Sequence, residues 1–147
     1  MIRSGSRCVT SAMTAASLPT LLNTMRAQGM RVSTARRSVL EALMAAAAPL
    51  TAEELAGDAD LASTYRNLET LESIGIVRHV HLGHGPGRYE LSDRSAGWAT
   101  CEACGRSTAL ASPALQAIRL AVREAAGFEA TFRHFPIVGR CANCAGP

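Results

Sequence analysis

The sequence predicts an α+β fold in two parts, a winged helix-turn-helix domain followed by a small α/β domain that a four-cysteine zinc site closes. Helical hydrophobic periodicity recurs as far as residue 74, and two extended segments around a glycine-rich turn follow it. Two Cys-x-x-Cys pairs then stand 36 residues apart in the C-terminal half. Several short helices followed by a hairpin is the element order of a winged helix, although periodicity alone indicates only a small helical domain with a hairpin.

Four short helices are expected in the first half, and local signals mark where each begins or ends. An apolar stripe opens the first helix, and serine, threonine and aspartate side chains can cap the first turns of the other three. The third helix also has a glutamate three residues after its cap, which makes a capping box. The helices are expected to begin at Leu18, Ser33, Thr51 and Asp60 and to be closed by Gly29, Pro49, Gly57 and Gly75.

The fourth helix has a small polar face opposite its apolar one. Leu68 and Leu71 lie on the apolar side, and the opposite side carries short polar residues and one arginine. Such a face can enter the major groove of DNA, because no bulky group keeps the backbone away. Glu69 and Glu72 weaken this interpretation, and an ordinary solvated helix face is the alternative. The residues expected to contact DNA here are Ser63, Tyr65, Arg66 and Thr70.

Basic residues are concentrated at the start of the chain. Residues 1–40 contain six arginines and no acidic residue, whereas the rest has nine arginines and twelve acidic residues. Guanidinium groups bind phosphate in a bidentate fork, so this segment favours a polyanionic partner. A solvated basic tail is the alternative interpretation.

The first residues show no periodic pattern, and residues 1–17 are expected to form a disordered tail. Met13 could be the true start in place of Met1, and Cys8, the odd fifth cysteine, is expected to be incidental. No run of 18 uncharged apolar residues suggests a membrane span, and no convincing export signal is present. These observations predict a cytoplasmic protein.

The two Cys-x-x-Cys pairs predict a structural zinc ion. A spacer of two residues lets both sulfurs of a pair turn toward one point, and two pairs supply the four thiolates of a tetrahedral site. Four protein ligands leave no open position, so this zinc would hold the fold without doing chemistry. Disulfides are the alternative, but a reducing cytosol disfavours them. The expected ligands are Cys101, Cys104, Cys141 and Cys144.

A series of short motifs follows in a fixed order along residues 18–144. They are Gly29-Met30-Arg31, Leu50-Thr51-Ala52-Glu53-Glu54-Leu55, Ser63-Thr64-Tyr65-Arg66-Asn67-Leu68-Glu69, Gly75-Ile76-Val77, Arg88-Tyr89-Glu90-Leu91, Cys101-x-x-Cys104-Gly105 and Gly139-Arg140-Cys141-x-x-Cys144. In this order they resemble the ferric uptake regulator family of metal-responsive bacterial transcription factors, which are usually homodimeric repressors.

The resemblance implies an organisation and a set of partners. It places a winged DNA-binding domain at residues 18–82, a hinge at 83–87 and a dimerisation and zinc-binding domain at 88–147. Arg31 and Arg36 would fall at basic positions of the DNA-binding surface. A homodimer would present two recognition helices to a palindromic double-stranded DNA operator, with half-sites about one helical turn apart.

The chain departs from the family where a regulatory metal is usually held. The histidine-rich run before the first Cys-x-x-Cys pair is replaced by residues 95–100, which include no metal ligand, and an expected acidic residue is replaced near Ala109. Surviving candidate ligands predict a second site, because residues two apart on a strand share one face. Such mixed ligands would suit zinc, iron, manganese or nickel. The candidates are His79, His81, His84, Glu90 and His134. Exposed hairpin histidines that bind no metal, with His134 as a simple hydrogen-bond donor, are the alternative interpretation.

Together these features predict a metal-dependent transcriptional regulator, most simply a repressor of metal-uptake or stress-response genes. One alternative is a paralogue that binds DNA constitutively or according to thiol redox state. Another is a zinc-stabilised protein-interaction module. An enzyme is not expected, because the sequence contains no metalloprotease motif, nucleophile elbow or phosphate-binding glycine loop.

Overall fold

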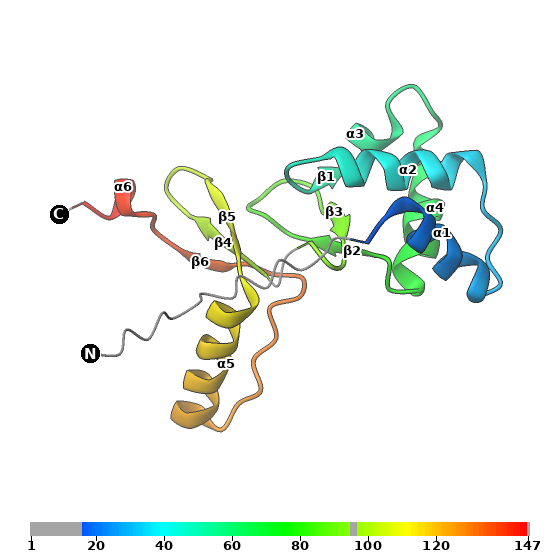
Figure 1. Ribbon diagram of the computed structural model, residues 1–147. Coiled ribbons are helices and arrows are strands. Elements are labelled where there is room, and N and C mark those ends of the chain that lie inside the picture. Colours follow the sequence, from blue (N-terminus) through cyan, green and yellow to red (C-terminus); the bar gives the residue numbers. More distant parts are fainter. Residues whose placement is uncertain (1–15, 95–96, 147) are drawn as a thin grey trace, which may run out of the picture.

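The computed structural model describes residues 16–94 and 97–146, which form two lobes with a three-stranded sheet in each (Figure 1). The first lobe holds helices α1 to α4 and one sheet, and the second holds the other sheet with helices α5 and α6. The α+β fold with a winged helix-turn-helix and a zinc-binding lobe is confirmed. None of the helices in the described residues is both long and apolar enough to cross a membrane.

The helices of the first lobe begin at the capping residues that the sequence predicts. Ser33, Thr51 and Asp60 each accept a hydrogen bond from an amide in the first turn, and Thr51 and Glu54 complete the capping box. Ser17 caps the first helix in the same way. The helices are α1 (Leu18–Ala27), α2 (Thr34–Ala45), α3 (Ala52–Ala56) and α4 (Leu61–Ser73).

The first sheet has the order β1-β3-β2, and both of its pairings are antiparallel. Its strands are β1 (Leu50–Thr51), β2 (Val77–Val80) and β3 (Arg88–Leu91). The expected hinge, residues 83–87, joins β2 to β3 and is therefore the turn of the wing hairpin. Because β3 pairs with both other strands, the first lobe extends to Leu91, and the boundary falls later than the sequence predicts.

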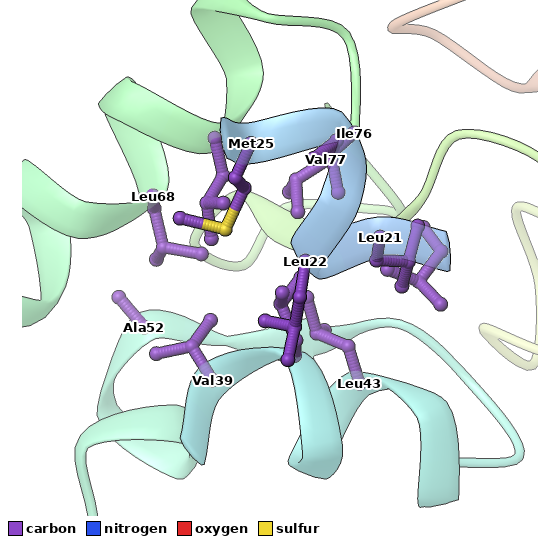
Figure 2. Close-up of a cluster of buried hydrophobic side chains, with 12 residues drawn as sticks. Leu21, Leu22, Met25, Val39, Leu43, Ala52, Leu68, Ile76 and Val77 are labelled. Carbon is purple, nitrogen blue, oxygen red and sulfur yellow. The ribbon is translucent and has the colours of Figure 1, made fainter. Parts of the chain in front are cut away.

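A continuous apolar core holds the first lobe together. Leu22 and Met25 of α1 lie between α2, which contributes Val39 and Leu43, and α4, which contributes Leu68 (Figure 2). The sheet adds Val77 of β2 and Leu91 of β3 to the cluster. The full set of buried members is Leu21, Leu22, Met25, Val39, Leu40, Leu43, Ala52, Leu68, Leu71, Ile76, Val77 and Leu91.

The second lobe is a sheet of order β5-β4-β6 with one long helix beside it (Figure 1). Its elements are β4 (Gly97–Cys101), β5 (Ser107–Leu110), α5 (Ser112–Ala126), β6 (Ile137–Gly139) and α6 (Ala142–Ala145). β6 pairs in parallel with β4, and Ile137 lies opposite Ala99. On α5, Leu115 is buried, whereas Ala125 is exposed. Ala111 is the N-cap of α5 and makes no side-chain capping hydrogen bond.

The expected tail is partly structured. Ser17 caps α1, and the main-chain amide of Ala16 donates a hydrogen bond of 2.8 Å to the Asp93 carboxylate. These two residues therefore belong to the first lobe. The expectations for Cys8 and Met13 lie outside the described residues.

Candidate metal and DNA-binding sites

The four predicted cysteine ligands meet at one end of the second lobe. Cys101 ends β4 and Cys141 precedes α6, and the parallel pairing of β4 with β6 sets the two Cys-x-x-Cys loops side by side. The four sulfurs all lie within 4.8 Å of one another, and none of these cysteines forms a disulfide. The sequence therefore assigns the four cysteines correctly to one site, although residues 105–140 separate the two loops.

The spacing of the sulfurs fits zinc. Zn–S bonds of about 2.3 Å in a tetrahedron place neighbouring sulfurs roughly 3.8 Å apart, and the Cys104 and Cys141 Sγ atoms are 3.8 Å apart. The amide of Cys141 donates to Cys101 Sγ at 3.3 Å and is the largest of the influences that lower the pKa of this thiol to about 6. Neighbouring sulfurs, Cys141 first, raise the pKa of Cys144 to about 12. Four cysteine sulfurs at this spacing form a structural zinc site.

A second group of metal-ligand side chains lies where the lobes meet. Glu72, His79 and His134 each offer one ligand atom, and these atoms lie within 4.8 Å of one another. Glu72 is in the last turn of α4, His79 is on β2, and His134 comes from the segment before β6. The structure therefore brings two of the predicted histidines together with a glutamate that the sequence analysis did not select.

Glu72 could have been found from the turn that follows α4. Gly75 has a positive φ of 74° and reverses the chain directly between helix and strand. A reversal this short brings the last helical turn alongside the start of β2, seven residues later. His79 Nδ1 accordingly contacts Glu72 Oε1.

Glu90, the predicted oxygen ligand, lies on the other face of the wing hairpin. It is paired across the strands with Arg78, whereas His79 is opposite Tyr89, and successive residues of a strand point to opposite faces. Glu90 Oε1 accepts hydrogen bonds from Arg78 Nε at 2.8 Å and Nη2 at 2.6 Å, and from Trp98 Nε1 at 3.1 Å. This buried carboxylate joins the wing to β4 through fixed donors, so it is not positioned to share an ion with the histidines.

The other two predicted histidine ligands are separated from the cluster. His81 stacks on Phe135 with ring centroids 5.3 Å apart, and its ring carbon also lies near Gly87 in the wing turn. Its main-chain amide donates to the carbonyl oxygen of His134 at 2.7 Å. His84 is exposed in the wing turn. The structure therefore gives His81 a packing position and leaves His84 at the surface.

The outer face of α4 presents the predicted DNA-contacting residues. Tyr65 is 40% exposed and the Arg66 side chain is 73% exposed. Arg66 lies 3.9 Å from the carboxylate of Asp60, a contact that costs little to break at this exposure. Ser63 and Thr70 are half-buried, and the Thr70 hydroxyl donates to the Arg66 carbonyl. Arg66 and Tyr65 are therefore the side chains most free to reach a partner.

The two upstream arginines differ in how they are used. Arg36 is half-buried, and its guanidinium donates to Asn67 Oδ1 at 3.3 Å and to the Arg31 carbonyl at 2.7 Å. The hydrogen bond to Asn67 ties α2 to α4, so Arg36 orients the fourth helix. Arg31 is exposed beside it, before the start of α2.

Comparisons with known proteins point to one group of regulators. The family model described as "Ferric uptake regulator family" matches residues 27–135. The peroxide operon regulator of Bacillus subtilis is 27% identical over 139 residues, which cover 90% of this chain and 96% of that protein. The peroxide-responsive repressor PerR of Staphylococcus saprophyticus is 25% identical over 130 residues, covering 84% of this chain and 88% of that protein.

Solved structures agree on the fold. The ferric uptake regulator of Helicobacter pylori superposes with a TM-score of 0.69 at 19% identity, covering 90% of this chain and 96% of that one. The ferric uptake regulator of Pseudomonas aeruginosa, determined with manganese, gives a TM-score of 0.63 at 26% identity, covering 82% and 97%. Both lobes of this chain fall within these matches.

Proposed function

The chain belongs to the ferric uptake regulator family, and from this membership we infer that it is a metal-dependent, DNA-binding transcriptional regulator. We propose more narrowly that it is a cytoplasmic repressor of metal-uptake or stress-response genes and has no enzymatic activity. Similar proteins are named as repressors and regulators that respond to peroxide. The observation that carries the proposal is the exposed, arginine-bearing outer face of α4, in a winged helix whose other helices hold it from behind.

DNA binding would use α4 in the major groove. Tyr65 and Arg66 stand outward from a helix whose opposite side is anchored by Leu68 and Leu71, so the helix can meet DNA without disturbing the core. An arginine in this position is suited to the O6 and N7 acceptors of guanine or to a phosphate. Arg31 would add a phosphate contact from the start of α2, while Arg36 holds α2 against the recognition helix.

The second lobe would make the homodimer. Exposed apolar residues gather there, including Leu120 of α5, Phe128 and Val138. A single sheet with one helix cannot cover both of its own faces, and two-fold pairing is the commonest way to cover the remainder. The zinc site would keep this surface in shape, because it fastens the start of the lobe to its end. Two recognition helices related by two-fold symmetry would read a palindromic operator.

The test is binding to duplex DNA that the zinc-loaded protein itself selects from a random-sequence pool. Arg66→Ala should weaken binding by roughly 5- to 150-fold, since a good base contact contributes about 1–3 kcal/mol. Fluorescence anisotropy at several salt concentrations measures this. Arg37→Ala is the matched control, because Arg37 is exposed on α2 and already paired with Glu41. Its affinity should stay close to that of the unchanged protein.

Other outcomes would favour the other interpretations. Selection of no duplex above background would contradict the regulator and favour a protein-interaction module. Equal affinity with and without added divalent metal would favour a constitutive regulator. Affinity that changes only on oxidation would favour a thiol-based switch at the cysteine cluster.

A further inference from the structure

We propose that Glu72, His79 and His134 bind a divalent transition-metal ion, so that the recognition helix itself supplies one ligand of the regulatory metal. This inference rests on the proposed function, because it names the site through which metal would control DNA binding. The three residues come from α4, from β2 and from the segment before β6, so an ion among them would connect both lobes.

Hydrogen bonding already orients His134 as a ligand. Its Nδ1 lies 3.2 Å from the carbonyl oxygen of His79, and a carbonyl oxygen can only accept. Nδ1 must therefore carry the proton, which leaves the lone pair on Nε2 free. Metal-binding histidines usually donate their second ring nitrogen to a carbonyl or carboxylate in this way. The bond from the His81 amide to the His134 carbonyl holds the main chain in the same place.

His79 and Glu72 complete a compact donor set. The His79 ring stacks on that of His134 with centroids 4.4 Å apart and planes 20° apart, while its Nδ1 faces Glu72 Oε1. Bonds of about 2.0–2.1 Å around a tetrahedral ion require donor atoms roughly 3.3–3.4 Å apart. The His79 and Glu72 donor atoms are closer together than this, and their side chains are 34% and 31% exposed, so they have room to rotate apart around an ion.

The donor types define the ion. Two imidazoles and one carboxylate are suited to zinc, iron(II) or manganese, and three protein ligands leave positions for water. An ion held in this way would exchange far more readily than one enclosed by four thiolates. Such a difference is what a regulator needs: the cysteine site stays loaded while the second site follows metal supply.

The wing hairpin alone does not supply such a site. Glu90 is bound to Arg78 and Trp98 on the opposite face, and His84 is exposed in the turn. With Glu72 as a ligand, the ion would fix the C-terminal turn of α4 directly to the zinc-bearing lobe. The simpler interpretation is a hydrogen-bonded Glu72–His79 pair with a stacked histidine and no ion.

The experiment titrates cobalt(II) into the zinc-loaded, full-length protein and follows its visible absorption, with metal content measured per chain. The unchanged protein should bind one cobalt besides its zinc. Glu72→Gln, His79→Ala and His134→Ala should each weaken cobalt binding by 10-fold or more while the zinc content stays at one per chain. His84→Ala is the matched control and should bind cobalt normally, because its side chain is outside the donor set.

The outcomes separate this site from the function on which it rests. Unchanged cobalt affinity in all three variants, or a loss in His84→Ala of the same size, would overturn the proposed ligand set even if DNA binding is metal-dependent. If His79→Ala or His134→Ala also loses zinc, the conclusion rests on Glu72→Gln, because this substitution preserves the shape of the side chain. Cobalt binding as expected, with no selected duplex bound in any metal state, would keep the site but contradict the regulatory function.

Discussion

The two lobes of this protein are stabilised by different means. In the first lobe, twelve buried apolar residues from four helices and a sheet form one cluster. In the second, the buried apolar residues among those described are Trp98, Cys101 and Leu115. The first lobe can therefore rely on apolar burial, at about 25 cal/mol per Å². The second has too little of it and must draw stability from zinc and, as we propose, from a second copy of the chain.

This difference fits the separate tasks that we propose for the lobes, DNA binding for the first and pairing for the second. A lobe that presents a recognition helix gains from a rigid core, because the helix then meets DNA in one orientation. A lobe that pairs with a second copy has to leave apolar surface exposed in the monomer, and the surface is covered only when the dimer forms. Zinc lets the second lobe keep its shape without using that surface for its own core.

Loss of zinc should have the largest effect and should separate the lobes. Cys104→Ser removes one of four thiolates, and structural zinc binding is worth about 10–16 kcal/mol in small zinc domains. Trp98 is the single tryptophan of the chain and lies in the second lobe, so its fluorescence should shift toward that of an unfolded chain. Circular dichroism should retain most of its helical signal, since α1–α4 are in the first lobe.

The control for this variant is Cys8→Ser, which should leave both the zinc content and the Trp98 emission unchanged. Simultaneous loss of the Trp98 signal and of the helical signal in Cys104→Ser would show that the first lobe also depends on zinc. The contrast between the lobes would then be wrong.

Removal of the buried carboxylate between the lobes should have the next largest effect. Glu90→Ala removes the carboxylate that the Arg78 guanidinium contacts at 2.6 Å, and the Arg78 side chain is only 15% exposed. Breaking a buried pair in this way costs about 3–5 kcal/mol. Urea unfolding followed by circular dichroism and by Trp98 fluorescence should show lower stability and transitions that no longer coincide. Glu41→Ala breaks an exposed pair and should change stability by about 0.5 kcal/mol or less.

Substitution of one leucine in each lobe should show the smallest difference between the lobes, in how each variant changes stability and self-association. Leu68→Ala opens a cavity in the core and should cost about 2–5 kcal/mol at any protein concentration. Leu120 is 45% exposed, so Leu120→Ala should leave the stability of an isolated chain almost unchanged. If α5 contributes to a dimer interface, this variant should instead weaken self-association, which dilution followed by analytical ultracentrifugation measures. Equal losses of stability in both variants at high dilution would remove the distinction between the lobes.

Local signals in the sequence predicted most of the first lobe. Ser33, Thr51 and Asp60 cap helices as expected, because capping depends on residues three positions apart. The cysteine cluster was also predictable, since the spacing within each pair already fits one ion. The boundary between the lobes could not be predicted. It depends on the pairing of β3 with β1, which joins residues about 38 positions apart and leaves no local signal in the sequence.

The ligand set at the junction shows where prediction from sequence ends. Glu90 has the right chemistry, but a shift of one position along the strand turns it toward Arg78 and Trp98. The helical pattern places Glu72 on the surface of the fourth helix, and only the tight turn at Gly75 brings it to His79. Likewise the inward face of α5 could be recognised as apolar, yet no pattern in one chain says whether its cover comes from the same chain or another.

The main-chain hydrogen bond between His81 and His134 joins the two lobes in a way that side-chain substitutions cannot easily alter. Any residue except proline supplies the same amide at position 81, and any residue at all supplies the carbonyl at position 134. Both histidines could therefore be substituted by other residues, and the main-chain hydrogen bond would still join the wing hairpin to the second lobe. The side chains that bind a signal are thus separable from the main-chain connection between the lobes. Descendants of this protein could therefore respond to a different signal while keeping the same connection.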